Sequence, residues 1–280
     1  MAENPKLEIE YIPVPQLPDY LTNEVNEAIR LYSVSMVVSD KEESRGLPCA
    51  GVFVTIDGQP GILTARHVWT EMHKREKLIL MVGGRPIRIR TSLLTAYHPQ
   101  SRPILEPFDA QVPDIAFVTL SSNNKGSIEA YGKVFYSVDR RASDSTFDLH
   151  GDDGFWIAIG SPQALLRRDI GAVGSLTYIT GIEKRIEFEG WDYLFVNLDI
   201  DSNDKIPADL VGMSGGGIWR AKFKVNADRT RYWIEDCGRD IILTGLTFLQ
   251  TPLEGRQLIA HGPMSIYHVF REFVLANRHK

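Results

Sequence analysis

The chain has 280 residues, of which 43% are hydrophobic and 24% are charged. That length suits one large domain or two of ordinary size, and the composition is that of a globular protein with ample apolar material for a core. The formal net charge of −5 argues against a general nucleic-acid binder, which needs a basic surface.

The cysteines and the N-terminus bear on the cellular compartment. Cys49 and Cys237 are too few for the disulfide framework of a small secreted protein. The start of the chain has no basic region followed by an apolar run, so no secretory signal is expected. No stretch approaches the ~18 apolar residues that span a bilayer. We therefore expect a cytoplasmic protein with neither a membrane nor a nucleic-acid partner.

Residues 1–32 are expected to form an extended arm followed by a short helix. Four prolines within residues 1–18 predict the arm. From Asp19 to Leu31, apolar residues recur at helical spacing. This amphipathic helix should pack on the body of the protein.

Residues 33–140 are expected to form a first antiparallel β-barrel. Short runs rich in β-branched residues are separated by Gly, Pro or Asp, which is typical of a barrel or sandwich. The predicted strands are 33–38, 50–56, 61–64, 78–82, 87–90 and 115–120. Polar stretches between residues 121 and 154 are predicted to hold the link to a second strand set.

Residues 141–280 are expected to form a second barrel and a C-terminal helix. The predicted strands are 155–159, 174–179, 185–189, 193–197, 216–219 and 241–248. Pro263 and Ser265 should open the helix, whose apolar stripe includes Ile266, Phe270 and Phe273. The pattern predicts an all-β chain flanked by helices at both ends.

Three segments of the chain each contain one group needed for nucleophilic catalysis: a base, a carboxylate and a hydroxyl. His67 ends the sequence Thr-Ala-Arg-His, Asp114 opens the strand-like run Asp-Ile-Ala-Phe-Val, and Ser214 lies in Gly-Met-Ser-Gly-Gly. A hydroxyl nucleophile needs a base to take its proton and a carboxylate to hold that base in the right tautomer. We therefore predict that His67, Asp114 and Ser214 form a catalytic triad.

Other histidines and carboxylates lie in sequence surroundings that are less typical of a catalytic base or its carboxylate. Asp109 is the nearest competing carboxylate, but the residues after it do not run into a strand. A lone histidine at a strand end is usually structural. We interpret the remaining histidines in that way: His73, His98, His150, His261, His268 and His279.

The glycines around Ser214 also fit the nucleophile elbow of α/β-hydrolases. That elbow requires a strand before the serine, a helix after it, and the partners in the order Ser, Asp, His. Asp236 or Asp240 with His261 would supply the order. A loop-like stretch precedes Ser214, however, and the glycines that follow it start a helix poorly. The order His, Asp, Ser is therefore favoured.

Together, the three motifs resemble those of the chymotrypsin-like (trypsin-fold) serine peptidases, in the plain form found in bacterial cytoplasm. The resemblance covers roughly residues 35–275, mostly through strand pattern. It implies two antiparallel six-stranded β-barrels with the active site between them, and cleavage of polypeptides through an acyl-enzyme. It also implies an oxyanion hole formed by the backbone N–H groups of Gly212 and Ser214. No metal or cofactor is implied.

The resemblance also bears on activation and specificity. Met213 stands where zymogen-type members have an Asp that pairs with a newly cleaved N-terminus, so activation by such cleavage is not expected. The base of the substrate pocket falls on Ala208, and its wall on the strand that holds Thr247 and Phe248. Ala208 predicts a neutral, small or apolar P1 side chain. A register shifted by one residue would place Asp209 there and select Lys or Arg.

Two other functions stay open. The same cleft would serve a catalytically restrained or inactive protein that binds peptides, and esters are an alternative substrate for the same acyl-transfer groups. Because the sequence shows no propeptide, an active protease would need restraint, and a regulatory protein partner is one means of providing it.

Overall fold

The computed structural model describes residues 18–39, 47–104, 109–144, 154–167, 172–173, 175–197, 210–226, 228, 231–251 and 257–278. The arm predicted for residues 1–17 lies outside them. The predicted helix is confirmed as α1 (Asp19–Tyr32), which buries Leu21, Val25, Ala28 and Ile29. Its apolar stripe contacts strands of both halves of the molecule, β2 (Leu47–Ile56) and β19 (Ile241–Gln250).

All predicted strands of the first half are confirmed. They form one sheet in the order β5-β4-β1-β2-β3-β9-β6, and β10 pairs in parallel with β2. The two-residue strands β6 and β10 were not predicted, because a period-2 pattern needs more residues to be visible. The bounds are β1 (Ser33–Ser39), β3 (Gln59–Thr64), β4 (Lys77–Val82), β5 (Arg85–Arg90), β6 (Ala96–Tyr97), β9 (Ala116–Thr119) and β10 (Tyr136–Ser137).

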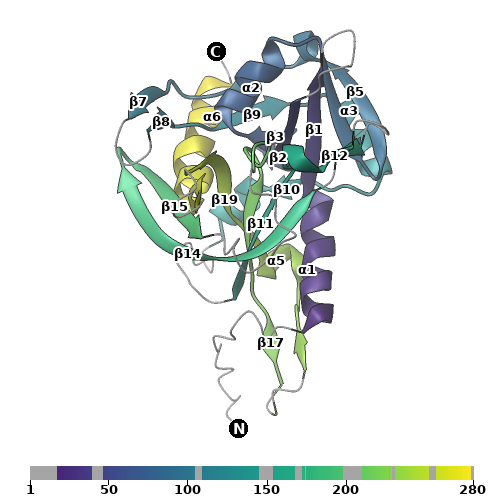
Figure 1. Cartoon of the computed structure of the whole chain (residues 1–280), viewed down its shortest axis with the longest axis vertical. Helices are drawn as coiled ribbons and strands as arrows, with labels where there is room; N and C mark the ends of the chain where they lie inside the picture. Colours follow the sequence, from purple (N-terminus) through teal and green to yellow (C-terminus); the bar gives the residue numbers. More distant parts are fainter. Residues whose placement is uncertain are drawn as a thin grey trace.

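The second half is a closed barrel in the order β11-β14-β15-β20-β19-β16. The strands predicted at 174–179 and 185–189 are in fact one, β14 (Leu176–Phe188), which is the long curved strand in Figure 1. Gly181 stays paired with Asn197, and an irregularity between Ile182 and Lys184 replaces the expected turn. β20 (Gln257–His261) was not predicted from the sequence. The other strands are β11 (Phe155–Gly160), β15 (Trp191–Asn197) and β16 (Gly217–Ala221).

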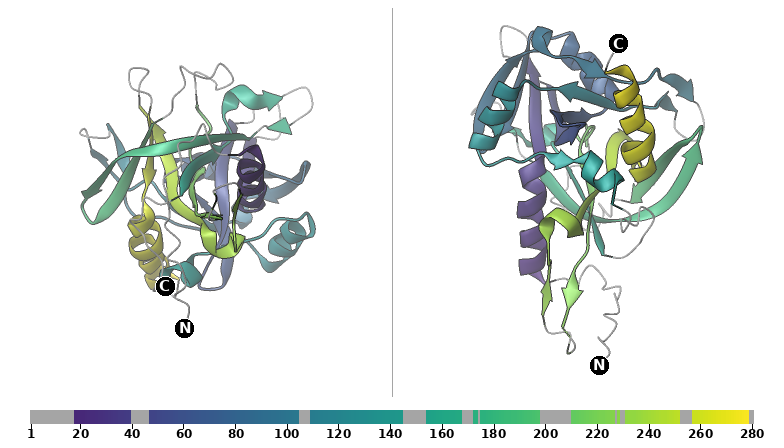
Figure 2. Two further views of the ribbon diagram at one scale, coloured as in Figure 1. Left: turned by 90° about the horizontal axis from the view of Figure 1, so that it is seen from below. Right: turned by 180° about the vertical axis from the view of Figure 1, so that it is seen from behind.

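Helices and small hairpins surround the two strand sets. The C-terminal helix is confirmed: it starts as the π-helix η4 (Ser265–Phe270) and continues as α6 (Arg271–Asn277). Figure 2 shows α1 and α6 on opposite sides of the molecule. No helix within the described ranges is long and apolar enough to cross a membrane. The remaining elements are α2 (Arg66–His73), α3 (Ser122–Ala130), α4 (Val138–Ala142), α5 (Cys237–Asp240), η2 (Thr91–Leu93), η3 (Gln163–Leu165), and the pairs β7 (Arg102–Ile104) with β8 (Ala110–Val112), β12 (Leu166–Arg167) with β13 (Ala172–Val173), and β17 (Lys224–Val225) with β18 (Tyr232–Trp233).

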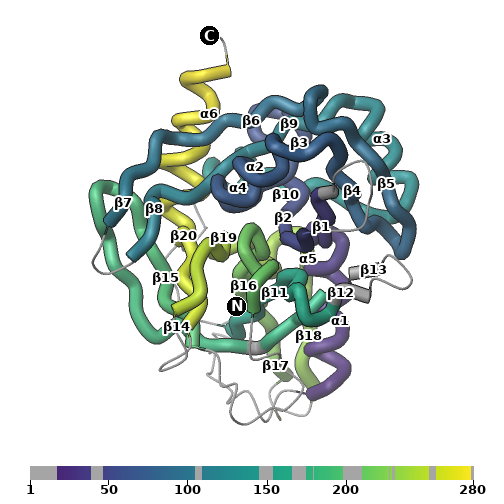
Figure 3. The backbone as a smooth tube through the Cα atoms, turned by 45° about the horizontal axis from the view of Figure 1, so that its top comes forward, coloured from purple at the N-terminus to yellow at the C-terminus, as the bar shows by residue number. Residues whose placement is uncertain are grey.

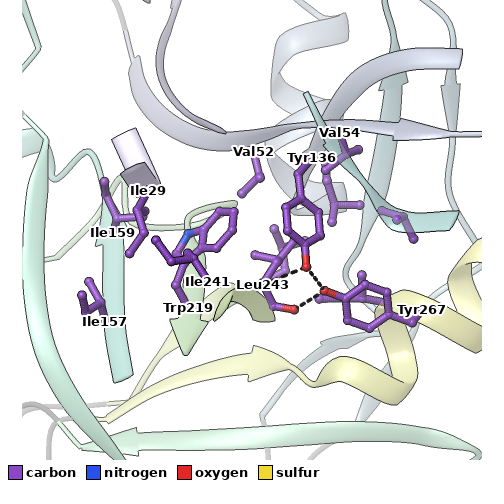
Figure 4. Close-up of a cluster of buried hydrophobic side chains, with 14 of the residues drawn as sticks. Ile29, Val52, Val54, Tyr136, Ile157, Ile159, Trp219, Ile241, Leu243 and Tyr267 are labelled. Carbon is purple, nitrogen blue, oxygen red and sulfur yellow. Dashed lines mark hydrogen bonds between the residues drawn. The ribbon is translucent and has the colours of Figure 1, made fainter. Parts of the chain in front are cut away.

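A shared hydrophobic core joins the first sheet to the barrel. Figure 4 shows Val52 of β2 close to Trp219 of β16, and Val54 of β2 beside Tyr136. Within this core, the hydroxyls of Tyr136 and Tyr267 lie 2.8 Å apart, and Tyr267 donates to the Leu243 carbonyl at 2.6 Å. The buried hydroxyls thus have partners, as burial requires. In Figure 3 the first sheet lies above the barrel, so residues from both can meet where the two units face each other.

Candidate active site

His67 lies at the start of α2, directly after β3. β3 ends at Thr64, Ala65 is extended, and the helix begins at Arg66. The first N–H groups of a helix have no partner within it. The backbone N–H of His67 donates to Oδ1 of Asp114 at 2.8 Å, so the Asp114 carboxylate caps this helix.

The same carboxylate contacts the His67 ring. Nδ1 of His67 lies 2.6 Å from Oδ2 of Asp114. Because an ionised carboxylate only accepts hydrogen bonds, Nδ1 must carry the proton. In the neutral ring Nε2 is then the unprotonated nitrogen, and it has no hydrogen-bond partner among the described residues. Asp114 is buried, whereas the His67 side chain is half exposed, so the free nitrogen belongs to an accessible ring.

Ser214 lies in a tight loop that both halves of the molecule hold. The Ser214 carbonyl accepts from the N–H of Ala50 on β2, at 3.2 Å. From β19, Thr247 accepts from the N–H of Gly215 at 2.7 Å and donates through Oγ1 to the Met213 carbonyl at 2.6 Å. The loop therefore sits where the first sheet meets the barrel.

Glycine is required on both sides of Ser214. Gly212 and Gly215 have φ angles of 100° and 85°, a region that other residues rarely adopt. A Cβ on Gly212 would collide with the carbonyl oxygen of Ser161, and one on Gly215 with the carbonyl oxygen of Ala50. The glycine pattern around Ser214 thus reflects both backbone conformation and close packing.

The hydroxyl of Ser214 is bonded to a carbonyl that a β-bulge exposes. Its Oγ donates to the Phe248 carbonyl at 3.3 Å. The pairing of β19 with β20 shifts register between Thr247 and Leu249, which places a β-bulge at Phe248. A bulge frees backbone groups in this way and commonly occurs beside functional sites. Within the described ranges, no hydrogen bond joins Ser214 Oγ to His67.

Two backbone N–H groups next to this hydroxyl are free. The Val211 carbonyl accepts from the N–H of Gln163 at 2.6 Å. In a trans peptide the N–H points away from the C=O, so the N–H of Gly212 points away from Gln163. Neither this N–H nor that of Ser214 has an acceptor among the described residues.

One cavity of about 650 Å³ brings these groups together. Its lining includes His67, Asp114, Gly212 and Ser214. Most of the other lining side chains are apolar, and none of the described ones is Lys or Arg. A concave apolar site with a few convergent polar groups is the usual form of a ligand-binding or catalytic site. The described part of the chain contains no cluster of three or more His, Cys, Asp or Glu side chains that would hold a metal ion.

Comparison with known proteins identifies the fold. No protein-family model matches the chain, and no curated protein matches it. Among solved structures, the active form of the Rv3671c protease from M. tuberculosis is similar, with a TM-score of 0.50 and 12% sequence identity. The match covers 94% of this chain and 87% of that one. The chain has the chymotrypsin-like serine protease fold.

A further solved structure is the inactivated protease paralogue S-I1 of the scabies mite. It matches with a TM-score of 0.49 and 12% identity, over 89% of this chain and 96% of that one. At 12% identity, the similarity to the Rv3671c protease shows the fold alone. The predicted fold class, all-β with two antiparallel barrels of the chymotrypsin-like type, is confirmed. The first strand set, expected to have six strands, is a sheet of eight, and the second is a closed barrel of six.

The chymotrypsin-like fold brings the predicted site residues to one place. His67, Asp114, Gly212, Ser214, Thr247 and Phe248 all line the cavity. Ala208 and Asp209 lie outside the described residues, so the base of the predicted pocket stays a prediction. Asp109 also lines the cavity, but the carboxylate that contacts His67 is that of Asp114.

Two contacts beside these residues were not predicted from the sequence. His261, interpreted as structural, accepts a hydrogen bond from the backbone of Asp114. The bulge at Phe248 was not foreseen either. Cys49 is buried, as expected of a small apolar residue, and burial raises the pKa of its thiol to about 12. Met213 is buried as well and packs into the barrel interior.

Proposed function

We propose that this protein is a serine endopeptidase. In the proposed reaction Ser214 is the nucleophile, His67 the general base, and Asp114 the carboxylate that orients His67. The observation that carries the proposal is the 2.6 Å contact between His67 Nδ1 and Asp114, in a cavity that Ser214 also lines. That contact leaves His67 Nε2 as the one ring nitrogen able to take a proton.

Reaction requires the serine hydroxyl to leave the Phe248 carbonyl. Ser214 must rotate from the Phe248 carbonyl toward His67 Nε2, a change between side-chain rotamers. Oγ then attacks the peptide carbonyl carbon while its proton passes to Nε2. The same proton is given to the leaving amine, and water hydrolyses the acyl-enzyme by the reverse sequence of proton transfers.

The negative charge of the tetrahedral intermediate needs donors near Ser214. We assign this role to the backbone N–H groups of Gly212 and Ser214, which have no acceptor among the described residues. Donors that are already oriented each contribute about 3–4 kcal/mol to such an intermediate. The bond between Val211 and Gln163 supports this assignment, because it fixes the orientation of the Gly212 peptide plane.

The edge of β19 offers a docking place for an extended polypeptide. β19 pairs with β16 only as far as Leu246, whereas its pairing with β20 continues to Gln250. The ladder between β16 and β19 therefore ends at Leu246, and β19 continues beyond it paired with β20. A peptide that adds to a free edge gains backbone hydrogen bonds independent of its sequence. This geometry favours a polypeptide substrate over a simple ester.

We expect an apolar side chain at the P1 position of the substrate. Leu210, Met213 and Leu258 line the cavity with Ser214, and a guanidinium buried among them would lose its hydration without gaining a partner. Matched chromogenic peptides with Leu or Phe at P1 should have kcat/KM values about tenfold or more above that with Arg, as burial of one such side chain allows. A preference for Arg would contradict this expectation and would point to Asp209 in the pocket.

Labelling with a fluorophosphonate probe tests the proposed function directly. The probe reacts only with an activated serine. We expect mass spectrometry to find one adduct, on Ser214, and none in Ser214→Ala. Ser127→Ala, which changes an exposed helix serine, should label like the wild-type protein. Wild-type protein that stays unlabelled under conditions in which a known serine protease reacts would refute the proposal.

A peptide-binding protein without catalysis is the second candidate. One observation favours it: the Ser214 hydroxyl is bonded to the Phe248 carbonyl and not to His67. In that case the probe would not react, but peptides would still bind along β19 with measurable affinity. Isothermal titration with an uncleaved peptide would separate the two functions.

A further inference from the structure

His261 joins the two halves of the molecule at the candidate site. It is the last residue of β20 in the barrel, and its side chain is fully buried. Its Nε2 lies 3.0 Å from the backbone nitrogen of Asp114, which precedes β9 of the first sheet. The two residues are 147 positions apart in the sequence.

The direction of this hydrogen bond defines the state of the His261 ring. A backbone N–H can only donate, so Nε2 of His261 is the acceptor and Nδ1 carries the proton. Burial lowers the pKa of His261 to about 4, which keeps the ring neutral around neutral pH. The Nδ1 group is buried without a hydrogen-bond partner among the described residues. An unpaired buried group is costly, and the hydrogen bond from Asp114 to Nε2 offsets part of that cost.

Three aromatic rings pack around the His261 ring. Ring centroids lie 5.6 Å away at Trp191, 5.1 Å at Tyr193 and 4.8 Å at Phe248. Phe248 is the residue whose carbonyl accepts from Ser214 Oγ. His261 thus contacts the backbone of Asp114 on one side and the neighbour of Ser214 on the other.

We propose that His261 is a positioning residue, which aligns Asp114, and through it the His67 ring, with Ser214 across the junction of the first sheet and the barrel. This inference rests on the proposed function. Asp114 and His67 come from the first sheet, whereas Ser214 and Phe248 come from the barrel. A direct polar bond between the two units holds the reacting groups at the required separation, and a misplacement of about 1 Å costs about 10²-fold in rate.

Three substitutions of His261 distinguish the role of its hydrogen-bond acceptor from the role of its aromatic ring in packing. His261→Phe keeps an aromatic ring but has no acceptor. The amide oxygen of His261→Gln reaches the place of Nε2, whereas that of the shorter His261→Asn reaches only the place of Nδ1. We expect the rate of fluorophosphonate labelling at Ser214 to fall about 10²-fold in the Phe and Asn variants. In the Gln variant it should recover to within about tenfold of the wild-type rate.

Two results would overturn the positioning role. Labelling of all three variants at the wild-type rate would show that the bond is unnecessary. Equal losses in the Gln and Asn variants, together with equal drops in unfolding midpoint by circular dichroism, would show that His261 serves packing alone. The Gln–Asn comparison decides the matter even if the Phe variant does not fold.

A spectroscopic readout keeps this inference distinguishable from the proposed function. The proton between His67 and Asp114 should give a low-field ¹H NMR signal, observable in the Ser214→Ala background. We expect the signal to persist with His261→Gln and to shift or broaden with His261→Asn. An unchanged signal in both double variants would overturn the inference. Failure of wild-type protein to react with the probe would instead refute the proposed function.

Discussion

Replacing Ser214 with alanine is expected to lower kcat for peptide hydrolysis by about 10⁶-fold, with little change in KM. A serine, its base and the orienting carboxylate act as a unit, so loss of the nucleophile removes the contribution of all three. The variant should retain its fold, because loop contacts such as the bond between Ala50 and the Ser214 carbonyl use the backbone. Steady-state kinetics with a chromogenic peptide, measured to the limit set by background hydrolysis, tests this expectation.

The control for this experiment is a serine outside the cavity. Ser127 is exposed on α3 and donates to the Asn123 carbonyl, so Ser127→Ala should leave kcat and KM unchanged. Residual activity of about 10³-fold over the uncatalysed rate would be consistent with oriented donors that still act on bound substrate. A Ser214→Ala variant as active as the wild type would rule out Ser214 as the nucleophile.

Replacing Asp114 with asparagine is expected to lower kcat by about 10⁴-fold. Asparagine has nearly the same shape, and its amide oxygen can still accept from the backbone N–H of His67, as Oδ1 of Asp114 does. Its NH₂ group would then face His67 Nδ1, where Oδ2 now lies 2.6 Å away. Because that NH₂ donates, Nδ1 would become the acceptor and the ring proton would move to Nε2. His67 could then no longer take the proton of Ser214.

Asp109 provides the matched comparison for this substitution. It lines the same cavity, but its carboxylate is not the one in contact with His67. Asp109→Asn should therefore retain kcat within a few-fold, while Asp114→Asn loses probe labelling and peptide hydrolysis together. Equal effects of the two substitutions would show that the cavity needs negative charge in general. They would count against an orienting role for Asp114.

Strands were predicted correctly where the sequence carries a local hydrophobic pattern. β1 to β4 and β9 contain short apolar runs bounded by turn residues, and β5 alternates isoleucine with arginine. β14 was split in the prediction because Gly181 is usually a break. Its pairing with β15 instead carries the strand past that glycine. β20 was missed because five residues beside a Pro- and Gly-containing segment show little periodicity.

The amino-acid sequence by itself predicted His67, Asp114 and Ser214 as the site, because each lies in a short motif of adjacent residues. It also indicated two strand sets and the helices at both ends, since burial of one face leaves a periodic pattern in the chain. Only the tertiary structure placed the bulge at Phe248, the end of the β16–β19 ladder at Leu246 and the hydrogen bond from Asp114 to His261. Those features depend on partners far apart in sequence, and contacts of that kind leave no local pattern.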